Sequence, residues 1–494
     1  MSTDRTLLAL DQSTSATKAI LFDVRGHVLD QESAAHAQHY PLAGWVEHDA
    51  EEIYQNTLTV LRHVLARCSA DSLPAFLSIT NQRETVVIFD RSTGQPLRPA
   101  IVWQCRRGEP ICQRLVDAGH EPLVHERTGL KIDTYFPASK ITWLIENEPA
   151  VRSALQEGRA LIGTIDAYLI YRLTGGAVFA TDATNASRTL LYDIHTLGWN
   201  DELCALFGVP RNARPEVRDS NAGYGATTLE GTLDQPLPIC GVMGDSQAAL
   251  FAQHCFTPGS AKVTFGTGSS ILVNIGDRPI PAEQGIVTAL AWQIDGAATF
   301  AYEGLINYSG ATIAWLTDQL RLIESPRETE ALARSVPDNG GVYLVPAFVG
   351  LSAPYWQPNA RAAIVGLSPA STREHVVRAA LESIAYQIRD IIELMGRAAG
   401  LRLQKIHGDG GGVANLFLMQ LVADVCRLEV EASEVSNLSA WGAALTGLLG
   451  RGVYDGLGAL NALPLPATHY VPQAPEAIIE AWYQGWLAAV QRVL

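Results

Sequence analysis

The stretch Leu7–Asp23, with the sequence LLALDQSTSATKAILFD, limits what this chain can fold into more than any other part of it. Two short apolar runs, Leu7–Leu10 and Ala19–Phe22, predict a pair of buried strands. Between them lie Asp11 at the end of the first run and then four hydroxyl residues and a cation, Ser13, Thr14, Ser15, Thr17 and Lys18. Hydroxyl and backbone N–H groups in such a loop suit phosphoryl oxygens, and a nearby carboxylate suits hydrated Mg²⁺. On its own, such a stretch is more often only a polar hairpin turn.

A second stretch with the same pattern favours a phosphate-binding loop over a simple hairpin turn. Ala261–Phe265 reads as a strand, Gly266–Ser270 as a small polar loop and Ile271–Ile275 as a second strand. The two units lie near the start of each half of the chain, which predicts a duplicated domain. Each loop would then offer N–H and hydroxyl groups to one side of a nucleotide phosphate chain.

Chain length and charge limit the classes of function. At 494 residues the chain is too long for one ordinary core, and we expect two large domains, residues 1–250 and 251–494, with a cleft between them. The net charge of −15 argues against a nucleic-acid partner, because no basic stripe is available to release counterions. An anionic substrate remains possible through local Arg and Lys side chains.

The seven cysteines and the apolar runs point to a cytoplasmic protein. No two cysteines have C-x-x-C spacing, so neither a zinc site nor a redox motif is indicated, and we expect reduced thiols. The first residues, MSTDRTLL, lack a basic segment followed by a long apolar core, so no secretory signal is expected. No apolar run approaches the roughly 20 residues that span a bilayer, so we expect no membrane insertion.

Asp245 stands where an apolar strand, Pro238–Met243, meets an apolar helix, Gln247–Gln253. A carboxylate at this place is often a helix N-cap. It is also well placed to point into a cleft as a general base, and the two roles do not exclude each other.

Four residues predict a small polyol site. Arg83 and Glu84 join two predicted strands, Ala75–Thr80 and Thr85–Phe89, and together offer donors and acceptors to neighbouring hydroxyls. Trp103 offers an apolar wall, and Tyr135 offers a hydroxyl in a loop. The alternatives are a surface ion pair of little energetic value and a tryptophan that belongs to the core.

The C-terminal half contributes a glycine-rich turn, His407–Asn415, between a predicted strand and the helix Leu416–Val425. Glycines let the backbone approach a ligand closely. The turn lacks the G-x-G-x-x-G pattern with its acidic residue, so a dehydrogenase is disfavoured. A helical stretch is expected from Gly304 to Leu316, and Ser371 with Glu374 predicts a capping box that opens a long helix.

The order of these motifs resembles the FGGY carbohydrate kinase family, and within it the glycerol kinases. The resemblance covers Leu7 to about Leu449 and rests on DQSTSATK, ITNQRET, IVWQCRR, GDSQAALFAQ, FGTGS, VPAFVGLSAPYW, ALESIAYQIRD and GDGGGVANLFLMQ. It implies an α/β, two-domain, actin-like ATPase (ribonuclease H-like) fold with duplicated mixed-sheet domains and a central cleft. It also implies a cytoplasmic kinase that uses ATP and Mg²⁺ to phosphorylate a terminal hydroxyl of glycerol or a closely related small polyol.

The resemblance assigns roles to individual residues. Asp245 would be the catalytic base, and Asp11 and Asp245 would lie near Mg²⁺. The polyol would meet Arg83, Glu84, Trp103, Tyr135, Asp245, Ser246 and Ser270. The nucleotide would meet Thr14, Ser15, Lys18, Thr267, Gly310, Ala314, Gly411 and Asn415.

Several positions depart from the usual pattern of the glycerol kinases. Ser246 replaces a glutamine, Ser270 an aromatic residue that packs on the glycerol carbons, Ser13 a glycine and Ala314 a common glutamine. The changes at 246 and 270 predict a larger and more polar pocket. A longer polyol or a keto-sugar, such as a tetritol, a pentitol or a ketopentose, is therefore the alternative substrate.

Two other functions fit the same fold. An actin-like ATPase that switches a protein partner would need no polyol site, which leaves Arg83, Glu84, Trp103 and Tyr135 unexplained. A sensor with a degenerate site would not need Asp11, Asp245 and Thr267.

The resemblance also suggests a homodimer or tetramer. The family's sugar-bisphosphate effector site needs a basic residue in the loop Ala226–Pro238, which has no Arg or Lys, so we expect no such regulation.

Overall fold

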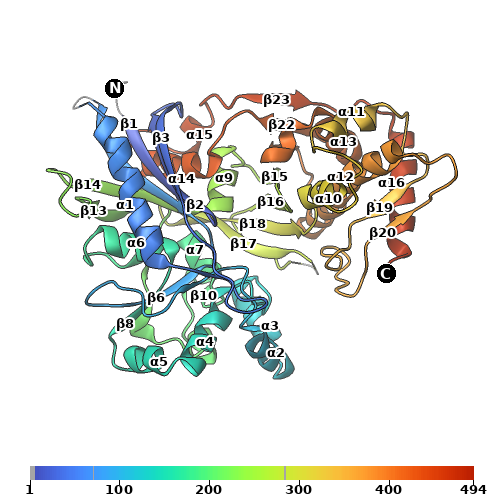
Figure 1. Cartoon of the computed structure of the whole chain (residues 1–494). Coiled ribbons are helices and arrows are strands. Elements are labelled where there is room, and N and C mark those ends of the chain that lie inside the picture. Colours follow the sequence, from blue (N-terminus) through green and yellow to red (C-terminus); the bar gives the residue numbers. More distant parts are fainter. Residues whose placement is uncertain (1–5, 70–71, 283–284) are drawn as a thin grey trace.

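The computed structural model describes residues 6–69, 72–282 and 285–494, and most of the N-terminal stretch assessed for a signal lies outside these residues. Two large mixed sheets form the two halves of the molecule, blue to green and yellow to red in Figure 1. The two-domain α/β expectation is confirmed.

The N-terminal sheet has the strand order β13-β14-β5-β1-β2-β3. Its strands are β1 (Thr6–Gln12), β2 (Ala16–Asp23), β3 (Val28–Ala35), β5 (Pro74–Asn81), β13 (Gly223–Thr227) and β14 (Leu237–Gly244). β1 runs antiparallel to β2 and parallel to β5, and β5 runs parallel to β14. In the β1–β2 register Asp11 lies opposite Lys18.

The C-terminal sheet repeats this arrangement in the order β17-β18-β16-β15-β21-β22-β23. Its strands are β15 (Ser260–Phe265), β16 (Ser269–Gly276), β17 (Val287–Ile294), β18 (Ala297–Ile306), β21 (Lys405–Asp409), β22 (Glu429–Ser433) and β23 (Ala467–Tyr470). β15 runs antiparallel to β16 and parallel to β21, as β1 does to β2 and β5. The predicted duplication of strand, polar loop and strand is therefore confirmed.

A smaller sheet, β4-β7-β6-β8, lies at the lower end of the N-terminal half (Figure 1). Its strands are β4 (Glu47–His48), β6 (Val86–Asp90), β7 (Ala100–Ile101) and β8 (Ala160–Thr164). Its helices are α2 (Glu109–Asp117), α3 (Glu121–Thr128), α4 (Pro137–Asn147) and α5 (Pro149–Gln156). Short pairs β9 (Ala180–Asp182) with β12 (Glu216–Arg218), β10 (Tyr192–Asp193) with β11 (Gly198–Trp199) and β19 (Tyr343–Val345) with β20 (Ala363–Val365) complete the strands.

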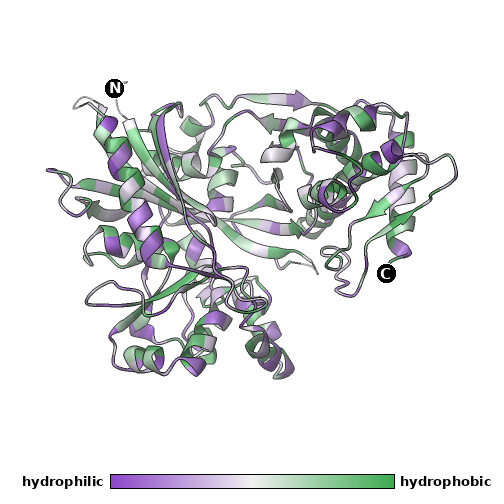
Figure 2. Ribbon diagram, viewed as in Figure 1, coloured by the Kyte–Doolittle hydropathy of each residue, from purple (hydrophilic) through white to green (hydrophobic). Residues whose placement is uncertain are grey.

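Helices cover the sheets, and several of them, such as α1, bury one apolar stripe. In the N-terminal half these are α1 (Ala50–Arg67), α6 (Ile165–Leu173), α7 (Ala183–Ser187), α8 (Asp201–Leu206) and α9 (Asp245–Ala252). In the C-terminal half they are α10 (Gly310–Asp318), α11 (Glu328–Arg334), α12 (Arg373–Ala399), α13 (Leu416–Cys426) and α16 (Glu476–Gln491). α14 (Leu438–Gly450) comes late in the chain but packs against α9 and the strands β1, β5 and β14 of the N-terminal sheet, and α15 (Leu457–Leu460) joins the same apolar cluster. In Figure 2 both green and purple residues lie along α1, as expected for such a helix.

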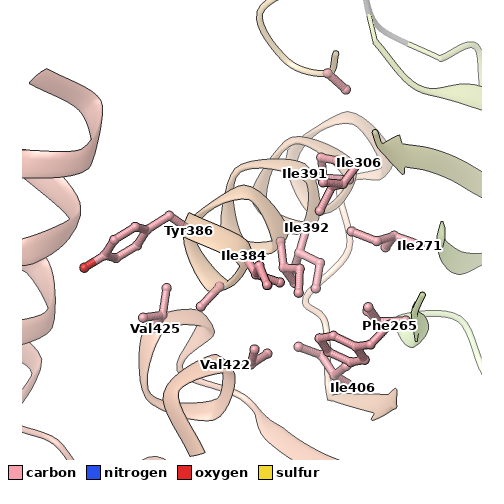
Figure 3. Packing of buried hydrophobic residues seen from close by; sticks show 14 of the residues in the cluster. Phe265, Ile271, Ile306, Ile384, Tyr386, Ile391, Ile392, Ile406, Val422 and Val425 are labelled. Carbon is pink, nitrogen blue, oxygen red and sulfur yellow. The ribbon is translucent and has the colours of Figure 1, made fainter. Parts of the chain in front are cut away.

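The core of the C-terminal half holds the second polar loop in place. Ile384 and Ile391 of α12 face Ile271 of β16 and Ile306 of β18, and Phe265 lies directly before the loop (Figure 3). A separate apolar cluster includes Leu7 of β1 and Leu272 of β16, so the two halves also pack against each other.

Two local expectations are wrong. Gly304 lies inside β18, and the following helix begins only at Gly310. A Cβ at residue 304 would lie 2.8 Å from Ile391 Cγ2, so this glycine lets the strand pass beneath α12. The capping box of α12 is formed by Thr372 and His375, because the Ser371 hydroxyl instead accepts a hydrogen bond from the Ser368 N–H.

None of the helices in the described ranges has both the length and the apolar character needed to cross a bilayer. All seven cysteines are free thiols, as expected.

Candidate active site

The first polar loop is fixed by contacts on both sides. The carbonyl oxygen of Thr14 lies 2.9 Å from His36 Nε2, and the Thr14 hydroxyl accepts a 3.0 Å hydrogen bond from Trp103 Nε1. The Ser13 hydroxyl donates to the Ala16 carbonyl at 2.9 Å, which closes the turn. Ser15 is exposed at the tip, where its hydroxyl is accessible.

The second polar loop is tied to helix α10. The N–H groups of Gly310 and Ala311 donate to the carbonyls of Gly266 and Thr267 at 3.0 and 2.9 Å. A Cβ at residue 310 would lie 2.6 Å from the Gly266 oxygen, so this contact requires glycine. The N-terminal end of α10 is thereby held beside the loop.

A cavity of about 950 Å³ opens beside this loop, within the C-terminal half. It is lined by Thr267, Gly310, Ala314, Gly411 and Asn415, all five of the residues that we assigned to the nucleotide from this half. A Cβ at Gly411 would meet nothing within 4 Å, so the backbone there is open to a ligand. The Asn415 side chain caps α13 through the Leu418 N–H and donates to Thr329 Oγ1.

A second cavity, of about 540 Å³, lies between the two halves. The N-terminal half lines it with Asp11, Lys18, Asp245 and Ser246, and the C-terminal half with residues that include Lys262, Thr264 and Asp409. Burial and the nearby Asp245 raise the pKa of Asp11 to about 6, although Lys18 acts in the opposite direction. This cavity therefore gathers carboxylates and cations from both halves.

Asp245 is the first residue of α9 and does not cap the helix. Gly244 holds the cap position without a side chain, and a Cβ there would lie 2.8 Å from Arg83 Cγ. Asp245 Oδ1 accepts a 2.6 Å hydrogen bond from the Ser246 N–H and lies 3.4 Å from Arg83 Nε. The side chain is 38% exposed, so it reaches the cavity.

Arg83 and Glu84 are buried, with only 5% and 1% of each residue exposed, which rules out a surface ion pair. Glu84 has a φ of 61°, in the left-handed region that non-glycine residues rarely adopt. The turn between β5 and β6 thus directs two consecutive charged side chains inward. Arg83 points toward Asp245 and Glu303 of β18, and Glu84 points toward Arg188.

Tyr135 and Trp103 lie together near these charges. Their ring centroids are 5.5 Å apart in an edge-to-face arrangement. Burial and the Glu84 carboxylate raise the pKa of Tyr135, so its hydroxyl stays protonated. Trp103 also reaches the first polar loop through Thr14.

Ser270 lies on β16 between Thr264 of β15 and Leu305 of β18. In the next cross-strand pair on the same face, Leu272 lies opposite Glu303, so Ser270 and Glu303 share one face of the sheet. The Ser270 hydroxyl is buried and has no hydrogen-bond partner in the described part of the chain.

The sequence analysis missed three charged residues of this region. Arg188 is 1% exposed, Glu303 is 2% exposed and Lys262 is 1% exposed. Lys262 lines the second cavity, and within the described ranges its ammonium group has no ion pair. Each lies in or directly beside an apolar or buried segment, and a lone charge there is the signal that would have identified it.

Comparisons with known proteins agree with this geometry. The N-terminal domain of the FGGY family of carbohydrate kinases matches residues 6–252, and the C-terminal domain of that family matches residues 261–450. The chain is 45% identical over 489 residues to a protein named glycerol kinase 1 from Thermotoga maritima, covering 99% of both chains. It is 46% identical over 487 residues to a glycerol kinase from Symbiobacterium thermophilum, covering 98% of both.

Solved structures show the same similarity. A Plasmodium falciparum glycerol kinase crystallised with ADP superposes with a TM-score of 0.95 at 33% identity, covering 99% of this chain and 98% of the other. A xylulose kinase from Rhodospirillum rubrum superposes with a TM-score of 0.88 at 25% identity, covering 99% of each. The chain therefore belongs to the FGGY family of carbohydrate kinases and is a phosphotransferase that acts on an alcohol group.

Proposed function

We propose that this enzyme transfers the terminal phosphoryl group of ATP to a terminal hydroxyl of glycerol or a closely related small polyol. The observation that carries this proposal is the position of Asp245. Its carboxylate lies 3.4 Å from Arg83 on the predicted polyol side and lines the cavity that holds Asp11 and Lys18 on the phosphate side. The high identity to several glycerol kinases supports glycerol as the acceptor.

The nucleotide would occupy the larger cavity. Gly310, Ala314, Gly411 and Asn415 would contact its nucleoside part, and Thr267 would contact the phosphates. Thr14, Ser15 and Lys18 of the first loop would meet the phosphates from the other half. Two loops rich in N–H and hydroxyl groups suit this task, because phosphoryl transfer depends mainly on positioning and on neutralising charge.

The residues also fit Mg²⁺. Asp11 and Asp245 present carboxylate oxygens to one cavity, and oxygen is the ligand atom that Mg²⁺ prefers. The effect of Asp245 on the pKa of Asp11 reflects a repulsion that a divalent cation would relieve. When bound, the metal ion would help to neutralise charge on the phosphate oxygens.

Asp245 would act as the general base. It would accept the proton of the polyol hydroxyl as the oxygen of that hydroxyl bonds to the terminal phosphorus and ADP leaves. Arg83, Glu84 and Tyr135 would hold the other hydroxyls, and Trp103 would cover the carbon chain. Orienting the attacking oxygen in this way converts a bimolecular reaction into an effectively unimolecular one.

Three further expectations, on the domain boundary, the location in the cell and the oligomeric state, accompany this proposal. We place the domain boundary near residue 250, at the end of α9, and we expect a cytoplasmic homodimer or tetramer. None of these three assignments depends on the identity of the polyol. Light scattering after size-exclusion chromatography would measure the oligomeric state.

A second candidate substrate is a four- or five-carbon polyol or a ketopentose. Ser246 lines the cavity beside Asp245, and the buried Ser270 hydroxyl has no hydrogen-bond partner among the residues that the structure describes, so both can serve an additional hydroxyl. An unpartnered buried hydroxyl is costly, and a ligand would satisfy it.

Release of ADP in the presence of ATP and Mg²⁺ tests the proposal. The acceptors are glycerol, dihydroxyacetone, erythritol, threitol, xylitol and ribulose. We expect ADP release to depend on the acceptor and to be fastest with glycerol. ADP release that does not depend on any of the acceptors would refute the kinase assignment. Poor turnover of glycerol together with rapid turnover of a longer polyol would refute only the assignment of glycerol as the acceptor.

The pair Ser270→Phe and Ser270→Ala tests how pocket size sets this preference. The phenylalanine variant fills space and should lower kcat/KM for the four- and five-carbon acceptors about tenfold more than for glycerol. The alanine variant removes only the hydroxyl and serves as its control. Equal losses on all acceptors in the phenylalanine variant would contradict a role for residue 270 in selecting chain length.

A further inference from the structure

A closed ring of four buried charges lies where the two halves of the molecule meet. Arg83 and Glu84 come from the β5–β6 turn, Arg188 follows α7, and Glu303 comes from β18 of the C-terminal sheet. Each of these residues is at most 5% exposed. We call these four residues the charge ring.

The contacts run in sequence around the charge ring. Arg188 Nε donates to Glu84 Oε1 at 2.6 Å, and Arg188 Nη1 donates to Glu303 Oε2. Arg83 Nη2 donates to Glu303 Oε1 at 2.8 Å, and Arg83 Nε lies 3.7 Å from Glu84 Oε1. Two cations and two anions balance, which offsets much of the large cost of burying charge.

Arg188 and Glu303 fix the parts of Arg83 and Glu84 that face away from the proposed acceptor. Arg188 occupies one carboxylate oxygen of Glu84, and no residue in the described ranges donates to the other, Oε2. Glu303 engages the end of the Arg83 guanidinium, and Nε is left on the side of Asp245. The second oxygen of Glu84 and the Nε edge of Arg83, which faces Asp245, thus have fixed orientations.

Arg188 also contacts the aromatic part of the site. Its guanidinium carbon lies 5.8 Å from the ring centroid of Tyr135 and 5.1 Å from that of Phe136. Burial alone would raise the pKa of Glu303, but Arg188 and Arg83 lower it to about 2, so Glu303 stays ionised. Arg188 therefore contacts two residues that we assigned to the polyol, Glu84 and Tyr135.

We propose that Glu303 and Arg188 are positioning residues for the polyol. Arg188 holds the Glu84 carboxylate and Glu303 holds the Arg83 guanidinium, so that the hydroxyls of the acceptor meet partners already in place. Because Glu303 belongs to the C-terminal sheet, the polyol site is complete only when the two halves are seated against each other. This inference rests on the proposed function and specifies how its acceptor site is built.

The variants Glu303→Gln and Arg188→Met test the proposal. Each keeps most of the side-chain volume and removes one charge from the charge ring. We expect KM for glycerol to rise about tenfold to a hundredfold, because charge-assisted hydrogen bonds to the acceptor lose their geometry. KM for ATP should stay within about twofold of the wild-type value.

Conservative variants and a matched control separate positioning from stability. Arg188→Lys and Glu303→Asp keep the charge and should recover part of the loss in KM for glycerol. Glu382 is the control, because it is 1% exposed and pairs with Arg378 at 2.8 Å in helix α12. Glu382→Gln should lower the melting temperature without changing KM for glycerol.

Several results would overturn the inference. One is a KM for glycerol within about twofold of wild type in both charge-removing variants. Another is a parallel rise of KM for glycerol and for ATP, which would indicate a general distortion of the active site and not the loss of polyol positioning. If Glu303→Gln does not fold, the comparison of Arg188→Lys with Arg188→Met decides. The inference would be contradicted if KM for glycerol were as high in Arg188→Lys as in Arg188→Met. A wild-type enzyme that phosphorylates no polyol would refute the proposed function and this inference together.

Discussion

At the scale of single residues, the proposed mechanism depends most on Asp245. Its carboxylate is accessible from the cavity, and its one hydrogen bond in the described structure comes from the neighbouring Ser246 N–H. The side chain contributes little to packing, so its removal should affect the reaction more than the fold. This separation makes it a clean site for substitution.

We expect Asp245→Asn to lower kcat by about 10²–10⁴, the contribution of a positioned general base. The melting temperature should change little, because the amide keeps the shape of the side chain. Initial rates of ADP formation with saturating glycerol and ATP give the measurement, and thermal unfolding gives the control. A variant that retains more than about a tenth of the wild-type kcat would exclude Asp245 as the base.

Whether a site residue can be recognised from the sequence depends on its neighbours along the chain. Asp245 and Arg83 stand at the ends of apolar runs, where a charge is conspicuous. Glu303 lies in the alternating strand FAYEGLI, and its partners are more than 100 residues away, so only the tertiary structure reveals its role. The left-handed φ of Glu84 is likewise invisible in the sequence.

At the scale of elements, apolar periodicity predicted the strands that flank both polar loops, but not where some helices begin. The helix expected from Gly304 begins at Gly310, because β18 must continue beneath α12 before the chain can turn. The N-cap of α12 is Thr372 and not the expected Ser371, because the local turn already uses the Ser371 hydroxyl. Tertiary packing and turn hydrogen bonds decide such boundaries.

The short helical turn Gly411–Ala414 gives an element-scale prediction for nucleotide binding. A Cβ at Gly411 meets no protein atom within 4 Å, so Gly411→Ala should fold normally and raise KM for ATP about tenfold by obstructing the nucleotide. Gly458→Ala, also free of neighbours, is the matched control and should leave KM for ATP unchanged. An unaltered KM for ATP in Gly411→Ala would place the nucleotide elsewhere.

The contact between α12 and α16 gives a prediction for stability. Asp390 of α12 accepts hydrogen bonds from Tyr483, Trp486 and Tyr355, the last two at 3.0 Å each. Burial nevertheless raises its pKa from 3.8 to about 6. The folded chain thus binds this proton more tightly than the unfolded chain, and the resulting stability is lost as the pH rises from about 4 to about 6.

Asp390→Asn removes that titration. The difference in the free energy of unfolding, wild type minus variant, should therefore decrease as the pH rises from 4 to 6. The decrease should be about 3 kcal/mol at most. Denaturant unfolding across this pH range measures the difference. The exposed Asp455→Asn is the control and should show no such trend, and a constant difference for Asp390→Asn would contradict the raised pKa.

At the scale of the whole molecule, the duplication could be predicted from the sequence, but the packing of the two halves against each other could not. The repeated pattern at β1–β2 and β15–β16 identified two related sheets. Their junction depends on the apolar cluster that joins Leu7 to Leu272 and on the ion pair between Arg83 and Glu303. Such contacts join residues more than 200 positions apart, beyond the reach of local patterns.

Regulation is also a property of the whole molecule, and we predict that fructose 1,6-bisphosphate does not alter turnover. The loop Ala226–Pro238 contains no Arg or Lys and carries Glu230 and Asp234. Arg62 of α1 approaches this loop but is already engaged, donating to the Leu229 carbonyl at 2.8 Å and lying 3.5 Å from Glu230. An anion with two phosphate groups would therefore meet carboxylates at this loop.

The measurement compares initial rates with and without the bisphosphate, at saturating and at half-saturating glycerol. Inorganic sulfate at equal ionic strength is the control, because salt alone screens surface charges. We expect ratios within about 20% of one in both conditions, well below the fivefold or larger change typical of allosteric coupling. Inhibition by the bisphosphate but not by sulfate would contradict this prediction.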